Sequence, residues 1–315
     1  MMAELMQVKG LTKSFGTMQA VKSIDFSIQE GRCVALLGPN GAGKTTTIRM
    51  LTGLLAPTAG EVRFHSLPPG EDRRSLIGYL PQTPAFHNWM SGMEYVVYAG
   101  RLCGLGASDA KKRATEMLER VGLADAAKRK LGGYSGGMKQ RLGLAQALVH
   151  QPKLLVMDEP VSALDPLGRR EVLRLLKELK SETTVLFSTH VLHDAEELCD
   201  DVVIIRAGEV ALQGSLTSIR SQHRRPVIEL KLEEGDPRGM AWARAFVEKS
   251  LSGEMRDSWL SEAELRDSRL YLTAVHMDEA RQGLMEELAR HAIPFSRLEI
   301  GYSSLEDLFM KVVGE

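Results

Sequence analysis

The chain has 315 residues, enough for one large core or for two domains. Its 40 basic and 41 acidic residues leave a formal charge of -1, so there is no overall electrostatic case for binding nucleic acid. Three cysteines, at positions 33, 103 and 199, lack CxxC spacing, which argues against a zinc site or a disulfide framework and fits a reducing cytoplasm. The first residues do not form a secretory signal and no 18 apolar residues run together, so we expect neither a signal peptide nor a membrane span.

The N-terminal stretch, residues 5–31, alternates polar and apolar side chains around a turn at Gly16 and Thr17. That period is typical of half-buried strands, so we predict an antiparallel sheet. Phe15 lies at the tip of this turn. Its ring could stack on a nucleotide base, or it could be a core side chain beside a hairpin.

A glycine-rich stretch follows the apolar run 33–37 and precedes a helical pattern that begins near Lys44. Its spacing, Gly-x4-Gly-Lys-Thr, is that of a phosphate-binding loop, because glycines let backbone amides approach an anion and the helix N-terminus adds free amides. Lys44 would reach the β and γ phosphates and the Thr45 hydroxyl would bind Mg2+, whereas the alternative is a glycine-rich turn with a surface lysine. The stretch reads Gly38-Pro39-Asn40-Gly41-Ala42-Gly43-Lys44-Thr45.

Two short strands are predicted next, at 61–65 and 77–80, and the second ends at Pro81. Gln82 comes directly after it. A neutral amide just past a strand end can coordinate a cation or orient a water molecule, and otherwise it is a solvated loop residue. By itself this position leaves both roles open.

Residues 91–131 have apolar side chains at helical spacing, which predicts helices over 93–102 and 111–121. A second glycine stretch then precedes a helix expected over 138–149. Ser135 is a good N-cap for this helix, and the glycines expose backbone amides. The stretch is either another helix N-terminus that meets an anion or a flexible loop before an ordinary helix.

Two apolar runs, 154–157 and 184–188, predict buried parallel strands. The first delivers Asp158 and Glu159 at its C-terminal end, where open α/β sheets place their chemistry. Asp158 would hold the water shell of Mg2+ and Glu159 would act as general base toward the attacking water, although such a pair is as often a helix N-cap. The second run delivers His190, which could hydrogen-bond a γ phosphate or be a solvated histidine.

An amphipathic helix over 169–180 and a strand pair at 201–205 and 209–212 follow. Beyond a polar linker at 222–226, strands and helices alternate in a pattern that predicts a small α+β unit of the split β-α-β kind. Its expected strands are 227–232, 270–273 and 297–300, its expected helices are 238–251 and 278–291, and a capped helix is expected over 304–310.

The chain carries, in this order, the phosphate-binding loop, Gln82, the glycine stretch that begins at Ser135, the pair Asp158-Glu159 and His190. This ordered set of motifs resembles the ATP-binding subunit of an ABC transporter over about residues 4–220. The resemblance implies an α/β fold of the P-loop NTPase class: an ABC-type ATPase core with a mixed sheet, an antiparallel β subdomain and a helical subdomain at about 84–150. Residues 1–220 would be the ATP-binding domain, and 221–315 a small C-terminal α+β domain for dimerisation or regulation, as in exporter-type subunits with a C-terminal extension. The implied motifs are Walker A at 38–45, the Q-loop at Gln82, the signature at 135–139, Walker B at 154–158, the D-loop around Asp165 and the switch histidine His190.

The same resemblance implies ATP and Mg2+ as ligands and a role for each motif residue. The implied catalytic residues are Glu159, His190 and Gln82, and the implied metal-binding residues are Thr45, Gln82 and Asp158. The implied nucleotide-binding residues are Phe15, Gly38, Pro39, Asn40, Gly41, Ala42, Gly43, Lys44, Thr45, Thr46, Ser135, Gly136, Gly137 and Asp158.

The resemblance further implies that one chain cannot complete the reaction. Ser135 and Gly137 would face the γ phosphate bound by a second copy, so that two subunits close head to tail around two ATP molecules. Phe15 stands where many relatives carry tyrosine and Tyr134 where they often carry leucine, and we expect neither departure to prevent ATP binding.

The leading interpretation is an ATPase subunit, cytoplasmic and peripheral on the inner face of the cell membrane, that drives a separate integral-membrane permease, with export as the expected direction. Its expected partners are the permease and a second ATP-binding subunit, and not nucleic acid. An apolar cluster after Gln82, made of Phe86, Trp89 and Met90, is either a docking site for a permease helix or core of the helical subdomain. The alternative functions are a soluble ABC ATPase acting on nucleic acid or the ribosome, which the single motif set disfavours, and a silent regulatory subunit, which the intact motifs disfavour.

Overall fold

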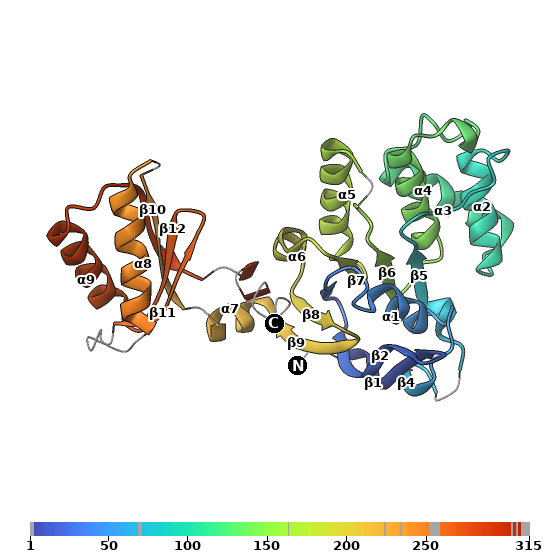
Figure 1. Cartoon of the computed structure of the whole chain (residues 1–315). Coiled ribbons are helices and arrows are strands. Elements are labelled where there is room, and N and C mark those ends of the chain that lie inside the picture. Colours follow the sequence, from blue (N-terminus) through green and yellow to red (C-terminus); the bar gives the residue numbers. More distant parts are fainter. Residues whose placement is uncertain are drawn as a thin grey trace. The chain divides into compact units, whose positions relative to one another are not determined.

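The computed structural model describes residues 3–68, 71–162, 164–223, 225–233, 235–251, 259–303, 305–306 and 308–309 (Figure 1). The chain divides into two compact units, the first made of residues 1–217 and the second of residues 218–314. The division falls close to residue 220, where the sequence places the end of the first domain.

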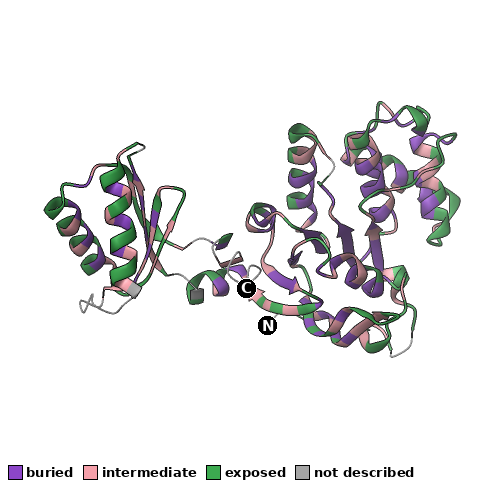
Figure 2. Ribbon diagram, viewed as in Figure 1, coloured by how far each residue is buried: buried purple, intermediate pink, exposed green. Residues whose placement is uncertain are grey.

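A six-stranded mixed sheet organises the first unit. Its strands are β3 (Cys33–Leu37), β5 (Ile77–Leu80), β6 (Leu154–Asp158), β7 (Thr184–Thr189), β8 (Asp201–Arg206) and β9 (Glu209–Ser215). The order across the sheet is β5-β6-β7-β3-β8-β9; the first five strands are parallel, and β9 pairs antiparallel with β8. Every residue of β3, β6 and β7 is buried (Figure 2), which confirms the buried parallel strands that the apolar runs predict.

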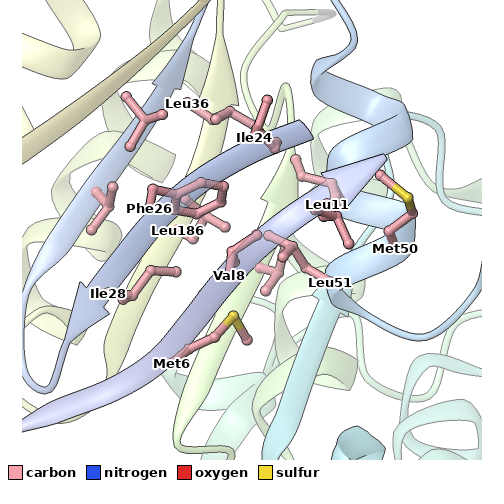
Figure 3. Packing of buried hydrophobic residues seen from close by; sticks show 14 of the residues in the cluster. Met6, Val8, Leu11, Ile24, Phe26, Ile28, Leu36, Met50, Leu51 and Leu186 are labelled. Carbon is pink, nitrogen blue, oxygen red and sulfur yellow. The ribbon is translucent and has the colours of Figure 1, made fainter. Parts of the chain in front are cut away.

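A second, antiparallel sheet of the first unit has the strands β1 (Glu4–Phe15), β2 (Met18–Gln29) and β4 (Ala59–Phe64). Their order is β2-β1-β4, and β1 and β2 form the hairpin that the alternating N-terminal pattern predicts. Apolar side chains of this hairpin pack against the six-stranded sheet and the helix that follows β3 (Figure 3). The packed residues include Met6, Val8, Leu11, Ile24, Phe26 and Ile28 of the hairpin, Leu36 and Leu186 of the large sheet, and Met50 and Leu51 of the helix.

The helices of the first unit are α1 (Lys44–Leu51), α2 (Gly92–Leu102), α3 (Ala107–Arg120), α4 (Gly136–Leu148), α5 (Pro166–Leu179) and α6 (Leu192–Leu198), with short 3-10 turns at Arg73–Leu76 and Leu131–Gly133. α2, α3 and α4 pack against one another. α4 begins at Gly136 rather than at the predicted 138, because the Ser135 hydroxyl accepts a hydrogen bond from the Met138 amide and caps the helix directly after itself. No described helix combines the length with the apolar composition that a bilayer demands of a spanning segment.

The second unit follows α7 (Leu216–His223), the helix in which the division falls. Its elements are β10 (Pro226–Leu232), α8 (Pro237–Leu251), β11 (Leu260–Arg266), β12 (Arg269–Ala274), α9 (Met277–Arg290) and β13 (Phe295–Tyr302). The antiparallel order β11-β12-β10-β13 is the split β-α-β arrangement that the sequence predicts. The prediction was wrong in omitting β11, an edge strand without a fully buried side chain. The helix expected over 304–310 falls partly outside the described residues.

Two of the three cysteines lie together although 166 positions separate them in the sequence. The Sγ atoms of Cys33 and Cys199 are 3.4 Å apart, and both thiols are free. Burial, together with the contact to Cys33, raises the pKa of the Cys199 thiol well above its ordinary value. Because the thiolate is the reactive form, the Cys199 thiol is a poor nucleophile at neutral pH.

Candidate active site

The predicted chemical groups lie at one edge of the six-stranded sheet. The glycine loop follows β3, Gln82 follows β5, Asp158 ends β6, and His190 follows β7. These four strands are parallel neighbours, so their carboxyl ends meet at the same edge. This is the position where open α/β sheets bind ligands.

The glycine loop is held by close backbone contacts. Gly43, at the start of α1, has a φ of 109°, and a Cβ there would lie 2.7 Å from the Ala20 carbonyl oxygen. At Gly38 a Cβ would lie 2.2 Å from the Ile205 carbonyl oxygen. Side chains do not fit at either position. The first-turn amides of α1, including those of Thr45 and Thr46, point out of the helix beside this loop, which suits an anion.

Lys44 is buried within the loop, at 5% exposure. Its Nζ donates hydrogen bonds to the carbonyl oxygens of Gly38 (2.7 Å) and Pro39 (3.0 Å) and lies 3.8 Å from Glu159 Oε1. Burial lowers the pKa of Lys44, while the Glu159 and Asp158 carboxylates act in the opposite direction. A phosphate oxygen would offer this ammonium a charged partner in place of neutral carbonyls.

Asp158 is the buried carboxylate of the site, at 2% exposure. Its Oδ1 accepts hydrogen bonds from the hydroxyls of Ser188 (2.7 Å) and Thr45 (3.2 Å). Hydroxyl and carboxylate oxygens are the donors that Mg2+ prefers, so Thr45 and Asp158 form a suitable oxygen pair beside the phosphate loop.

Three predicted residues converge on the carboxylate of Glu159. Its Oε2 accepts a hydrogen bond from Gln82 Nε2 (3.1 Å), and its Oε1 lies 3.3 Å from His190 Nδ1 and 3.8 Å from Lys44 Nζ. The Glu159 side chain is 12% exposed, whereas that of His190 is 45% exposed. A carboxylate so placed can take a proton from a water molecule at the mouth of the loop.

The signature residues are not part of this cluster. Ser135 and Gly136 are exposed, and Ser135 accepts hydrogen bonds from the Met138 amide through its hydroxyl and from the Lys139 amide through its carbonyl oxygen, both in the helix that it caps. One residue later in the same helix, Gln140 donates a hydrogen bond from Nε2 to the carbonyl oxygen of Pro160 (2.9 Å) and so joins α4 to the loop after Glu159. Sequence reasoning missed this contact, because a glutamine on a helix gives no sign of its partner.

Phe15 is 48% exposed at the hairpin tip, which rules out the alternative that it is a core side chain. Lys13 Nζ lies 5.3 Å from the centre of its ring. The ring is therefore accessible, and a base could stack on it as an aromatic face allows.

The apolar cluster divides between the two roles that the sequence leaves open. Met90 is a core residue, at 8% exposure, whereas Trp89 is 70% exposed. Phe86 is half-buried and packs edge to face on Tyr95, with ring centres 4.9 Å apart. Trp89 is thus the exposed member of the cluster, and its ring lies beside that of His87, with ring centres 5.7 Å apart.

The D-loop residue Asp165 caps α5 by accepting a hydrogen bond from the Gly168 amide at 3.0 Å. Ala163, in the same loop, lies outside the described residues.

Ser188 is a further residue that sequence reasoning did not single out. The available signal was a serine directly after the apolar run Val185-Leu186-Phe187, at the end of a buried strand.

Comparisons with known proteins place the chain in a family. A family model described as "ABC transporter" matches residues 21–162. The chain is similar to the uncharacterized ABC transporter ATP-binding protein YxlF of Bacillus subtilis strain 168, at 46% identity over 98% of this chain and 99% of that protein. It is also similar to the linearmycin resistance ATP-binding protein LnrL of the same strain, at 34% identity over 98% of both chains. A solved dimer of the ATP-binding cassette MJ0796 in a post-hydrolysis state with ADP and Pi gives a TM-score of 0.61 at 28% identity, over 67% of this chain and 99% of that chain.

Proposed function

Because the chain belongs to the ABC transporter family, as an ATP-hydrolysing subunit that powers a separate permease, we propose that it drives export from the inner face of the cell membrane. The observation that carries the hydrolytic role is the convergence of Gln82, His190 and Lys44 on Glu159. The similarity to a resistance protein over nearly the whole of both chains supports export, since removing a toxic compound confers resistance.

Within the site, Glu159 accepts a proton from the water that attacks the γ phosphorus, and Gln82 and His190 orient its carboxylate. Lys44 and the first-turn amides of α1 hold the phosphates. Thr45 and Asp158 would hold Mg2+, whose charge would offset that of the phosphate oxygens. The bond from γ phosphorus to the bridging oxygen breaks, and ADP and phosphate leave.

We further propose a head-to-tail homodimer, in which Ser135 and Gly137 contact the γ phosphate on the phosphate loop of the second copy. Two observations support this. Both residues lie at the N-terminus of α4, where Ser135 is exposed and Gly137 half-buried, and the hydrogen bonds of Ser135 stay within this helix. The similar cassette MJ0796 forms a dimer with ADP and Pi. Loss of the γ phosphate would remove the charge that holds the two copies together.

Copurification tests the proposed function. The tagged chain is expressed in its native host, membranes are extracted in mild detergent, and the copurifying proteins are identified. We expect a stoichiometric protein with several membrane spans, and a deletion strain that accumulates more linearmycin than its parent. Recovery only in the soluble fraction, with ribosomes or nucleic acid, would overturn the transporter function; reduced accumulation in the deletion strain would overturn export.

Trp89→Ala is expected to uncouple transport from ATP hydrolysis. A buried tryptophan anchor at an interface is worth about 2 kcal/mol or more, which corresponds to roughly thirtyfold weaker docking of the permease. Basal ATP hydrolysis by the isolated chain should stay unchanged, because Trp89 is 70% exposed and outside the site. The measurements are permease binding and basal phosphate release.

Met90→Ala is the matched control for that variant. Met90 is a core side chain, so its truncation should lower the free energy of unfolding by about 2–5 kcal/mol and reduce transport and hydrolysis together. Equal loss of both activities in Trp89→Ala would assign Trp89 to the core as well and contradict the docking role.

A further inference from the structure

Ser188 contributes a fully buried hydroxyl to an otherwise apolar stretch of β7. The hydroxyl donates a hydrogen bond to Asp158 Oδ1 (2.7 Å) and accepts one from the Glu159 amide (2.9 Å). It therefore contacts two consecutive residues of the site, one through its carboxylate and the other through its backbone. The register of β6 and β7 explains the contact, since Asp158 and Ser188 are directly paired across the two strands.

The backbone of Glu159 needs such a partner. Its φ of 46° lies in the left-handed region, which costs a residue other than glycine about 1–2 kcal/mol. This conformation turns the chain sharply after β6 and aims the carboxylate at Gln82 and His190. The Glu159 amide lies just beyond the last residue of β6, and the Ser188 hydroxyl accepts its hydrogen bond.

We propose that Ser188 is a positioning residue for ATP hydrolysis, which sets the Asp158 carboxylate and the Glu159 backbone relative to each other through one hydroxyl. The inference rests on the proposed roles of these two residues. In the proposed reaction the Asp158 carboxylate holds the metal and the Glu159 carboxylate accepts a proton from water. A group that fixes both residues therefore determines the distance between the metal-binding group and the proton acceptor. Ser188 lies two residues before His190, which directly follows β7. A shift of the C-terminal end of β7 would therefore move His190 relative to the Glu159 carboxylate that it contacts.

The test compares Ser188→Ala and Ser188→Thr in the full chain. Removing the hydroxyl should lower kcat about a hundredfold, the range for a misplacement of about 1 Å, while KM and the affinity for a fluorescent ATP analogue change less than about threefold. Ser188→Thr keeps the hydroxyl and should restore at least a tenth of the wild-type kcat. The measurements are phosphate release over a range of ATP concentrations and equilibrium binding of the analogue.

A second readout does not depend on activity. Hydrogen exchange of the peptide that contains Glu159 should become faster in nucleotide-free Ser188→Ala, while peptides elsewhere in the first unit keep their protection. Thr184→Val is the matched control, because Thr184 is an equally buried residue of β7 whose hydroxyl accepts a hydrogen bond from the Gly31 amide (2.9 Å) at the far end of the strand. It should lower stability without lowering kcat.

The outcomes separate this inference from the proposed function. An unchanged kcat in Ser188→Ala, or a fall in kcat matched by a general loss of protection, would show a purely structural serine and overturn the inference. A low kcat with faster exchange at Glu159 alone would support it. If Glu159→Gln left turnover intact, the role of Glu159 would fail, and the exchange result would still report whether Ser188 holds that backbone.

Discussion

Glu159→Gln is expected to lower ATP turnover by about two to four orders of magnitude, the range for loss of a general base. Glutamine has nearly the same shape, so the contacts with Gln82 and His190 can remain, but its neutral amide cannot take a proton from water. ATP should bind and stay uncleaved. The measurements are phosphate release at saturating ATP and size-exclusion chromatography with ATP, in which a stable dimer should appear.

The control for this variant is Glu178→Gln, an exposed carboxylate on α5 that has no contact with the site. It should leave turnover within about twofold of the wild-type value, since surface substitutions usually have small effects. Turnover in Glu159→Gln within threefold of the wild type would rule out the general-base role.

Lys44→Met is expected to raise the Kd for ATP about a hundredfold or more. Methionine fills a similar volume but offers no charge and no donor, and hydrogen bonds to charged groups contribute about 1.5–3 kcal/mol each. The buried Lys44 ammonium now bonds to two loop carbonyls, which the variant leaves without their donor. Equilibrium binding of a fluorescent ATP analogue measures the effect, and thermal unfolding checks that the loop is still folded.

Lys153→Met removes an exposed lysine just before β6 and should leave the Kd unchanged. A Kd within threefold of the wild type in Lys44→Met would contradict the role of this side chain in phosphate binding. Together the two site variants distinguish binding from chemistry, since Glu159→Gln should bind ATP without cleaving it and Lys44→Met should fail to bind it.

The buried strands could be predicted because they have short apolar runs and the motifs occur at their ends, whereas the order of the strands across the sheet was not predicted. β5 lies at Ile77–Leu80, the range that the sequence predicts. β11 could not be predicted, because an edge strand buries little and its Ser-Glu-Ala-Glu stretch is as polar as a loop. Helix ends depend on capping contacts, and therefore α4 begins at Gly136 rather than at 138.

Long-range partners are the part of the site that the sequence does not reveal. The sequence places Gln82, Glu159 and His190 after predicted strands, and the structure brings their side chains together, while their catalytic roles stay predictions. The contact of Gln140 with Pro160 depends on side-chain packing between elements, which no periodicity encodes. The same holds for the approach of the Cys33 and Cys199 thiols.

The bonds of Lys44 to the carbonyls of its own loop determine how an anion would enter. The loop is already ordered around a cation, so an incoming phosphate exchanges hydrogen-bond partners and does not have to organise the chain. The conformational entropy of the loop is thus lost when the protein folds and not when the ligand binds. The cost of ordering the loop is therefore not subtracted from the electrostatic free energy of binding. Binding should consequently be fast and weaken as ionic strength rises, because charge and not induced order supplies most of the gain.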